Sequence, residues 1–225
     1  MKTRFVAAFL AAALAVTMAL PPLASADMTE RRERQMREAR DLPSKALDAL
    51  NAQDADRAIA LYTKAIESGV FRSEPETLGQ LYLERATAHR MKNDCTSAIA
   101  DFTKAAEYIR KGDIFFGRAA CYLEMNQEDK ALADFGLAIE ADPEAPAYRK
   151  SRCILLFNKM DYTAALPDCE KALAAAPNDK NLLLATSQAA EQTGNRSRAA
   201  ELYRRLQAAD PGNPVATEGL KRAGS

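Results

Sequence analysis

The arrangement of apolar and polar residues divides the chain into three parts. An uncharged apolar run extends from Phe5 to Leu20. A very polar stretch follows, from Thr29 to Arg40, with five arginines and three glutamates. Beyond Arg40, apolar residues recur at spacings of three and four, which is the period of an amphipathic helix. The pattern predicts an all-α chain preceded by a separate N-terminal segment.

The N-terminal run has the layout of a secretory signal peptide, residues 1–26. Lys2 and Arg4 precede the apolar run, and an Ala-Ser-Ala sequence ends at Ala26. A signal peptidase accepts small residues of this kind, so we expect cleavage between Ala26 and Asp27. The run of 16 apolar residues is shorter than the stretch of about 20 that spans a bilayer. An anchor that is not cleaved is the alternative interpretation.

The charged stretch is expected to be a solvated leader, residues 27–41. Its glutamates are interspersed among its arginines and offset most of their field. The alternative is a basic arm that contacts anionic lipid or an acidic partner. We assign no site to this segment.

An internal repeat with a period near 34 residues begins after the leader. Its clearest column consists of alanines separated by 40, 33, 34 and 34 residues: Ala58, Ala98, Ala131, Ala165 and Ala199. Four residues beyond each alanine stand Tyr62, Phe102, Phe135, Cys169 and Tyr203. Three residues further on stand Ala65, Ala105, Ala138, Ala172 and Leu206. These spacings place the three columns on one face of a helix, which a neighbouring helix must cover.

Each of these helices follows another apolar-periodic segment and a short polar turn. The four clear leading segments are 81–92, 114–125, 148–159 and 182–193. Asp and Asn residues in the turns, such as Asp94 and Asn195, are well placed to cap the second helix. Pro43 is expected to shorten the leading helix of the first unit. The chain is therefore expected to contain five helical hairpins.

The second helices of the middle units resemble those of the tetratricopeptide repeat family. The matching segments are AIADFTKA (98–105), ALADFGLA (131–138) and ALPDCEKA (165–172). The first helices match less well, because the chain has no tryptophan and only Tyr122 stands for the family's late tyrosine. The resemblance implies a right-handed α-solenoid over 42–225. Its repeats would span about 42–75, 79–111, 112–145, 146–179 and 180–213, with a capping helix at 214–223.

The resemblance also implies that the first helices line a concave groove that binds a protein or peptide. The apolar residues at the groove positions of the middle units are Leu83, Phe116, Leu123, Ile154 and Phe157, flanked by Arg90, Lys150 and Asn158. This grouping suggests an apolar anchor site for a partner. The alternative is that Leu123 and Ile154 are shared between stacked hairpins. A clamp for a terminal carboxylate is not expected, because only Arg90 and Lys150 occupy its places.

Four cysteines in an exported chain are expected to meet oxidising conditions. No CxxC or CxxCH sequence occurs, which argues against thioredoxin-like, zinc-ribbon and haem-attachment motifs. The resemblance places Cys153 and Cys169 opposite each other inside one hairpin, where a disulfide is expected. Cys95 and Cys121 are a second candidate pair, across a repeat junction. The alternative for all four is that they are buried thiols.

Charge and residue content argue against several classes of function. The chain has 31 basic and 31 acidic residues, which does not favour nucleic-acid binding. Its single histidine, His89, stands where the family buries an aromatic residue. No glycine-rich phosphate loop or G-x-S-x-G motif occurs. No catalytic residue, metal site or cofactor is therefore expected.

Together these features predict an exported, non-enzymatic scaffold that binds a protein or peptide in the cell envelope, in the periplasm of a Gram-negative bacterium. After signal cleavage no contact with the membrane is expected. Two alternatives remain open. One is a structural assembly module that binds through the edges of the solenoid or self-associates. The other is a membrane-tethered scaffold that retains residues 1–26.

Overall fold

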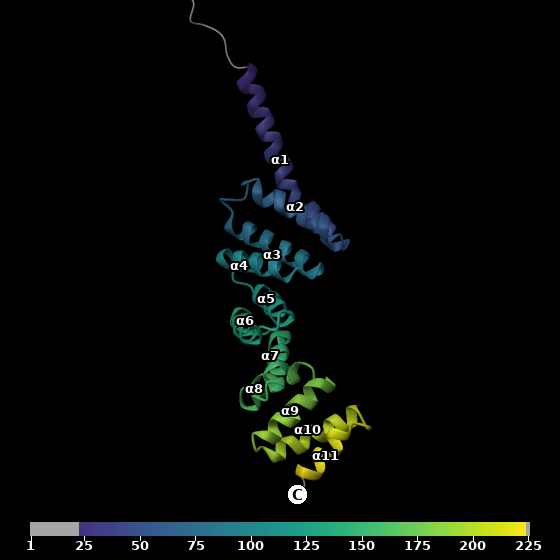
Figure 1. Cartoon of the computed structure of the whole chain (residues 1–225). Coiled ribbons are helices and arrows are strands. Elements are labelled where there is room, and N and C mark those ends of the chain that lie inside the picture. Colours follow the sequence, from purple (N-terminus) through teal and green to yellow (C-terminus); the bar gives the residue numbers. More distant parts are fainter. Residues whose placement is uncertain (1–22, 224–225) are drawn as a thin grey trace, which may run out of the picture.

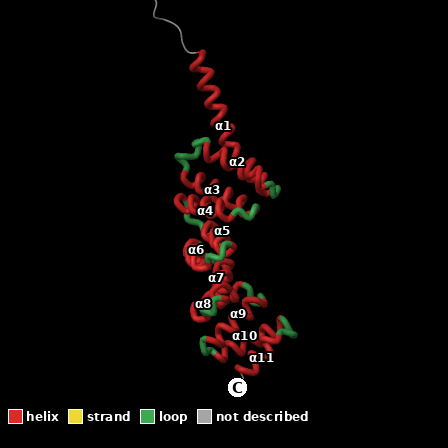
Figure 2. The backbone as a smooth tube through the Cα atoms, in the orientation of Figure 1, coloured by secondary structure: helices red, strands yellow, loops and turns green. Residues whose placement is uncertain are grey.

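The structure, a computed structural model, describes residues 23–223 of the chain. These residues form eleven α-helices and no strand (Figure 2). The helices are α1 (Leu23–Asn51), α2 (Ala55–Glu67), α3 (Pro75–Met91), α4 (Cys95–Tyr108), α5 (Gly112–Glu124), α6 (Glu128–Ala141), α7 (Pro146–Asn158), α8 (Tyr162–Ala175), α9 (Lys180–Gln192), α10 (Arg196–Ala209) and α11 (Pro214–Ala223). Most of the expected signal peptide lies outside the described residues.

The helices pair as hairpins that stack along one long axis (Figure 1). Each odd-numbered helix from α1 to α9 packs against the helix that follows it, and each hairpin packs against the next. The chain is thus an all-α solenoid, as the repeat pattern predicted. Among the residues that the structure describes, no helix combines the length and apolar character needed to cross a membrane.

The three columns of the sequence repeat form the core of the solenoid. Every alanine of the first column is fully buried, with 0% exposure. The residues four positions further on, from Tyr62 to Tyr203, are at most 1% exposed. Small side chains let neighbouring helices approach closely, and the aromatic rings fill the space beside them. The period of the sequence therefore corresponds to one buried layer per hairpin.

Polar residues in the turns cap four of the second helices. The side chains of Asp54, Asp94, Asp161 and Asn195 each accept a hydrogen bond from the backbone N–H three residues on. Asn195, which begins an Asn-x-Ser sequence, is therefore a helix cap. Gln127 before α6 makes no such side-chain bond. Capping bonds satisfy N–H groups that have no partner within the helix.

The first unit differs from the sequence prediction at Pro43. This residue lies inside α1, which continues to Asn51 instead of being shortened. Ala46 and Ala49 of α1 are buried in one cluster with Tyr62 of α2. This packing offsets the cost of a proline inside a helix, about 3 kcal/mol. The boundary expected between residues 41 and 42 also falls inside α1, so the charged leader and the first unit share one helix, whose first half projects from the solenoid (Figure 1).

Buried ion pairs connect the two helices of the middle hairpins. The pairs are Arg85–Asp101, Arg118–Asp134 and Arg152–Asp168. The three aspartates are only 6%, 4% and 3% exposed. Arg85 and Arg118 also donate to Thr63 and Thr103 on the preceding hairpin, at 2.9 and 3.0 Å. The arginines therefore join each hairpin internally and to its neighbour.

Candidate functional surface

The apolar residues of the predicted groove are half-buried. Leu83, Phe116, Ile154 and Phe157 each pack against one of the core clusters. The Phe116 ring lies 5.1 Å from that of Tyr148, and the Phe157 ring lies 5.7 Å from that of Tyr162. Both phenylalanines therefore contribute to packing between helices, and neither is a fully exposed anchor. Leu123 and Ile154 likewise pack into core clusters.

The polar residues that flank this group differ in their surroundings. Lys150 Nζ donates to Asp179 Oδ2 at 2.5 Å, and this bond holds the pKa of Asp179 below its ordinary value. Arg90 is half-buried, and its Nε is buried without a hydrogen-bond partner. Asn158 at the end of α7 is exposed. Of these three, Asn158 is the most accessible to a partner.

A hollow of about 840 Å³ lies between the first and second hairpins. Its walls come from α1, from α3, and from the last residue of α4 with the turn that follows it. The lining residues are Pro43, Ser44, Leu47, Glu76, Thr77, Gln80, Leu81, Glu84, Tyr108, Ile109, Arg110 and Lys111. Gln80 lies three residues before Leu83, a predicted groove residue on the same helix.

The hollow combines accessible apolar surface with a polar network. Leu47 is 41% exposed and Tyr108 is 39% exposed. Lys111 Nζ donates to Gln80 Oε1 at 2.8 Å, and Gln80 Nε2 donates to Glu84 Oε1 at 2.9 Å. This chain of bonds fixes the amide of Gln80 between a cation and a carboxylate. The arrangement suits a ligand with apolar side chains and a polar backbone.

The sequence prediction missed the contribution of α1 to this hollow. Ala58 and Ala98 are 40 residues apart, so the same shift relates Pro43 to Leu83 and Leu47 to Thr87. Leu83 is a predicted groove position of the second unit, so Pro43 occupies the equivalent position of the first, and Leu47 lies about one turn further along α1. The signal was present in the period, but the expected break at Pro43 concealed it.

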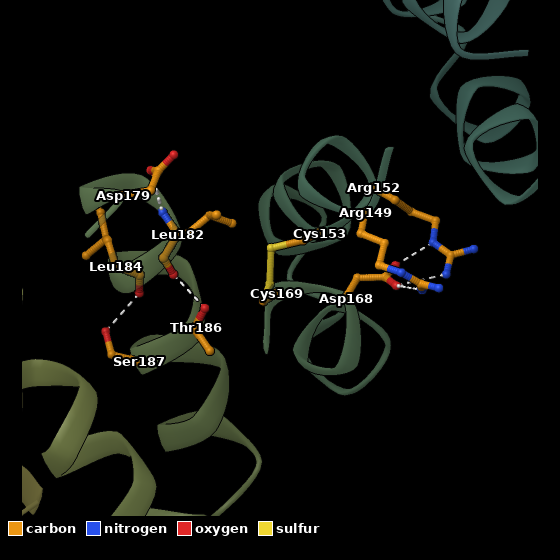
Figure 3. The surroundings of a disulfide bond; sticks show 10 residues. All are labelled: Arg149, Arg152, Cys153, Asp168, Cys169, Asp179, Leu182, Leu184, Thr186 and Ser187. Atoms are coloured by element: carbon orange, nitrogen blue, oxygen red, sulfur yellow. Dashed lines mark hydrogen bonds and ion pairs between the residues drawn. A yellow bond between two sulfur atoms is a disulfide. The ribbon is translucent and has the colours of Figure 1, made fainter. Parts of the chain in front are cut away.

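The structure contains the disulfide between Cys153 and Cys169 that was expected inside the fourth hairpin (Figure 3). Figure 3 shows Arg149 and Arg152 converging on Asp168 beside it, at 3.2 and 2.5 Å. The other residues labelled in that view belong to α9 and its N-cap: Asp179, Leu182, Leu184, Thr186 and Ser187. The bond links α7 to α8 and does not involve the neighbouring hairpin.

The second candidate pair is not bonded in the structure. Cys95 and Cys121 are both free thiols. The Cys95 Sγ donates a hydrogen bond to Oε2 of Glu124 at 3.0 Å. This thiol therefore contacts a carboxylate and forms no disulfide with Cys121. Both cysteines are buried, in agreement with the alternative that they are interior thiols.

A stacked array of helical hairpins with a lined hollow is the architecture of protein-binding repeat scaffolds. Residues 112–144 and 159–222 match models described as tetratricopeptide repeats. The chain is a tetratricopeptide repeat protein. Proteins of this family are generally non-catalytic scaffolds that bind proteins or peptides.

Individual relatives are similar to only part of the chain or share only its fold. A rice (Oryza sativa subsp. japonica) SGT1 homolog is 40% identical over 107 residues, which is 44% of this chain but 26% of that protein. YrrB, a tetratricopeptide repeat protein with an unusual peptide-binding site, superposes with a TM-score of 0.68 at 20% identity, over 86% of this chain and 97% of its own. MamA superposes with a TM-score of 0.62 at 14% identity, over 80% and 93%. These structures share the solenoid fold.

Proposed function

We propose that this protein is an exported scaffold that binds an extended protein segment along its concave surface, in the envelope of a Gram-negative cell. The observation that carries the proposal is the hollow of about 840 Å³ between α1, α3 and the α4–α5 turn. It offers exposed apolar groups next to fixed polar ones. The peptide-binding site named for YrrB, which has the same fold, supports a peptide as the ligand.

The proposed path of the ligand runs from this hollow toward the fourth hairpin. At one end, Leu47 and Tyr108 provide accessible apolar contacts. At the other end, Asn158 is exposed next to Phe157. The proposed path passes the half-buried Leu83 and Phe116. Apolar contact at separate points, with polar groups between them, is typical of the recognition of extended segments.

Photo-crosslinking in cells tests this path. A photoreactive amino acid is placed at Tyr108 in the hollow and, separately, at Asn158, where it leaves the packing of Phe157 intact. A probe at the exposed Lys171 of α8 is the control. We expect the first two probes to capture the same protein and the Lys171 probe to capture none. Capture at Lys171 alone, or the absence of capture at both groove positions, contradicts binding along the groove.

Binding through the hairpin turns is a second candidate, supported by exposed methionines. Met91 ends α3, whereas Met125 and Met160 lie in the turns of the next two hairpins, and the three side chains are 43%, 41% and 72% exposed. Methionine is a flexible apolar residue that suits adaptable contact surfaces. If the chain self-associates through this edge, replacing the three with glutamine lowers the sedimentation coefficient at high concentration. Under the groove proposal the same variant still captures the partner at Tyr108.

The location of the protein depends on the fate of residues 1–26. Cleavage between Ala26 and Asp27 releases a chain with 29 basic and 31 acidic residues. An intact mass that begins at Asp27 in the periplasmic fraction supports export as a soluble scaffold. A full-length mass in the membrane fraction supports the tethered alternative instead.

A further inference from the structure

Cys95 and Cys121 are two free thiols at the interface of the second and third hairpins. Cys95 is the first residue of α4 and is 8% exposed, whereas Cys121 in α5 is fully buried. Both belong to one apolar cluster with Phe102 and Ile114. Glu124, which accepts a hydrogen bond from the Cys95 thiol, follows Cys121 by three residues, about one helical turn, on α5. The start of α4 therefore lies against the turn of α5 that carries Cys121.

The carboxylate of Glu124 lies against the more exposed thiol. Cys95 Sγ donates to Glu124 Oε2 at 3.0 Å. Burial raises the pKa of Cys95, and the neighbouring Cys121 thiol and Glu124 carboxylate raise it further. Burial also raises the pKa of Cys121. Because the thiolate is the reactive form, a nearby carboxylate keeps Cys95 protonated and slow to react.

We propose that Cys95 and Cys121 are a redox-active dithiol that Glu124 keeps reduced and that an external disulfide can oxidise to a second disulfide bond. The Cys95 thiolate attacks one sulfur of the oxidant, and the bond to its other sulfur breaks. Cys121 then attacks the Cys95 sulfur of this mixed disulfide and displaces the remaining oxidant sulfur. Two electrons pass to the oxidant, and the two protons end on its two released thiols.

This bond would connect different hairpins, unlike the bond that the structure contains. Cys153 and Cys169 lie in the same hairpin. Cys95 and Cys121 lie on α4 and α5, at the junction of two units. Hairpins of a solenoid contact only their neighbours, and bending occurs at these junctions. Oxidation of Cys95 and Cys121 therefore restricts bending between the second and third hairpins, next to the proposed binding surface.

Timed oxidation of the full chain tests the dithiol. Protein with Cys95 and Cys121 reduced and the Cys153–Cys169 bond intact is incubated with glutathione disulfide. Samples are then denatured, alkylated and weighed as intact protein and as peptides. We expect both alkylation sites to be lost together and a peptide joining Cys95 to Cys121 to appear. Two thiols that remain alkylatable, or two separate glutathione adducts as the end product, overturn the proposal.

Substitutions separate the two halves of the mechanism. Cys121→Ser is expected to stop the reaction at a glutathione adduct on Cys95. Glu124→Gln lowers the pKa of Cys95, so oxidation accelerates by about threefold for each unit of that decrease. Glu144→Gln, in the exposed turn between α6 and α7, is the matched control and leaves the rate unchanged. If Glu124→Gln keeps the wild-type helical content and oxidises no faster, Glu124 does not protect the thiol.

Discussion

Arg118 and Asp134 form a two-point ion pair inside the third hairpin. Nε and Nη2 of the arginine each donate to one carboxylate oxygen at 2.7 Å. The side chains are only 14% and 5% exposed. The hydrogen bonds that Arg118 donates to Asp134 raise the pKa of Arg118 above its ordinary value. The same pair recurs at Arg85 and Asp101, so this contact repeats with the period of the solenoid.

Removing the acidic partner of this pair should strongly destabilise the chain. Asp134→Ala leaves a buried guanidinium without its carboxylate, which costs about 3–5 kcal/mol. The matched control is Glu140→Ala, which breaks the Arg110–Glu140 pair, whose side chains are 60% and 64% exposed. We expect that change to cost less than about 1 kcal/mol. Urea unfolding followed by circular dichroism measures both, and equal losses contradict the importance of burial.

The Cys153–Cys169 disulfide should stabilise the fourth hairpin. The two residues are separated by 16 positions, and a crosslink of this size stabilises by about 3 kcal/mol. Replacing both by alanine should lower the unfolding midpoint, and a reductant should lower the wild-type midpoint to a similar value. Replacing the free thiols Cys95 and Cys121 by alanine is the control. A reductant should still lower the midpoint of that control protein, because it retains the bond.

The left-handed turn residue Met160 should be replaceable by glycine with a gain in stability. Its φ is 60°, and its side chain is 72% exposed, so few contacts are lost. Glycine adopts this conformation without strain, and we expect Met160→Gly to stabilise by up to about 1 kcal/mol. Gly194 occupies the equivalent turn of the fifth hairpin with a φ of 85°. Gly194→Ala should destabilise by a similar amount in the same unfolding assay, and a loss of stability in Met160→Gly would show that its side chain contributes contacts.

Acid should loosen the C-terminal helix α11 through Glu191. Arg222 donates to both carboxylate oxygens of Glu191, at 2.6 and 3.0 Å, and Tyr203 donates at 2.5 Å. The Arg222 bond is the main cause that lowers the pKa of Glu191 below its ordinary value of 4.5. Because the pKa of the folded state is the lower one, the stabilisation is present above pH 4.5 and is lost as the pH falls through the folded value.

Amide hydrogen exchange of α11 between neutral and acidic pH measures this effect. Protection should decrease in the acid range in the wild type. Glu191→Gln should remove most of that pH dependence, whereas Glu218→Gln, in an exposed pair with Lys221, should leave it in place. A wild-type profile that does not change with pH rules out this role of Glu191.

The repeat columns allowed the fold to be predicted from local pattern alone. A buried alanine with a large residue four positions later, such as Ala98 and Phe102, requires a helix with one face covered by a neighbouring helix. Recurrence of that pair with a nearly constant period requires equivalent hairpins to stack. Neither inference depends on a contact between residues far apart in the chain. The turn caps at Asp94 and Asn195 were predictable for the same reason.

The surface was less predictable, because exposure depends on how neighbouring hairpins meet. Phe116 and Phe157 occupy groove positions, yet Tyr148 and Tyr162 pack against their rings and leave them half-buried. Pro43 favours the end of a helix locally, but burial of Ala46 and Ala49 against α2 keeps α1 continuous and creates one wall of the hollow.

The sequence by itself therefore determined the helices, their pairing and the composition of each buried layer, because these follow from residue size and spacing within about 34 positions. Only the tertiary structure decided which side chains remain accessible, that Arg118 meets Asp134, and that the Cys95 thiol donates to Glu124. Such outcomes depend on distances of a few ångströms between helices. These distances are set by the angle and offset at which each pair of helices packs, and no local sequence pattern encodes them.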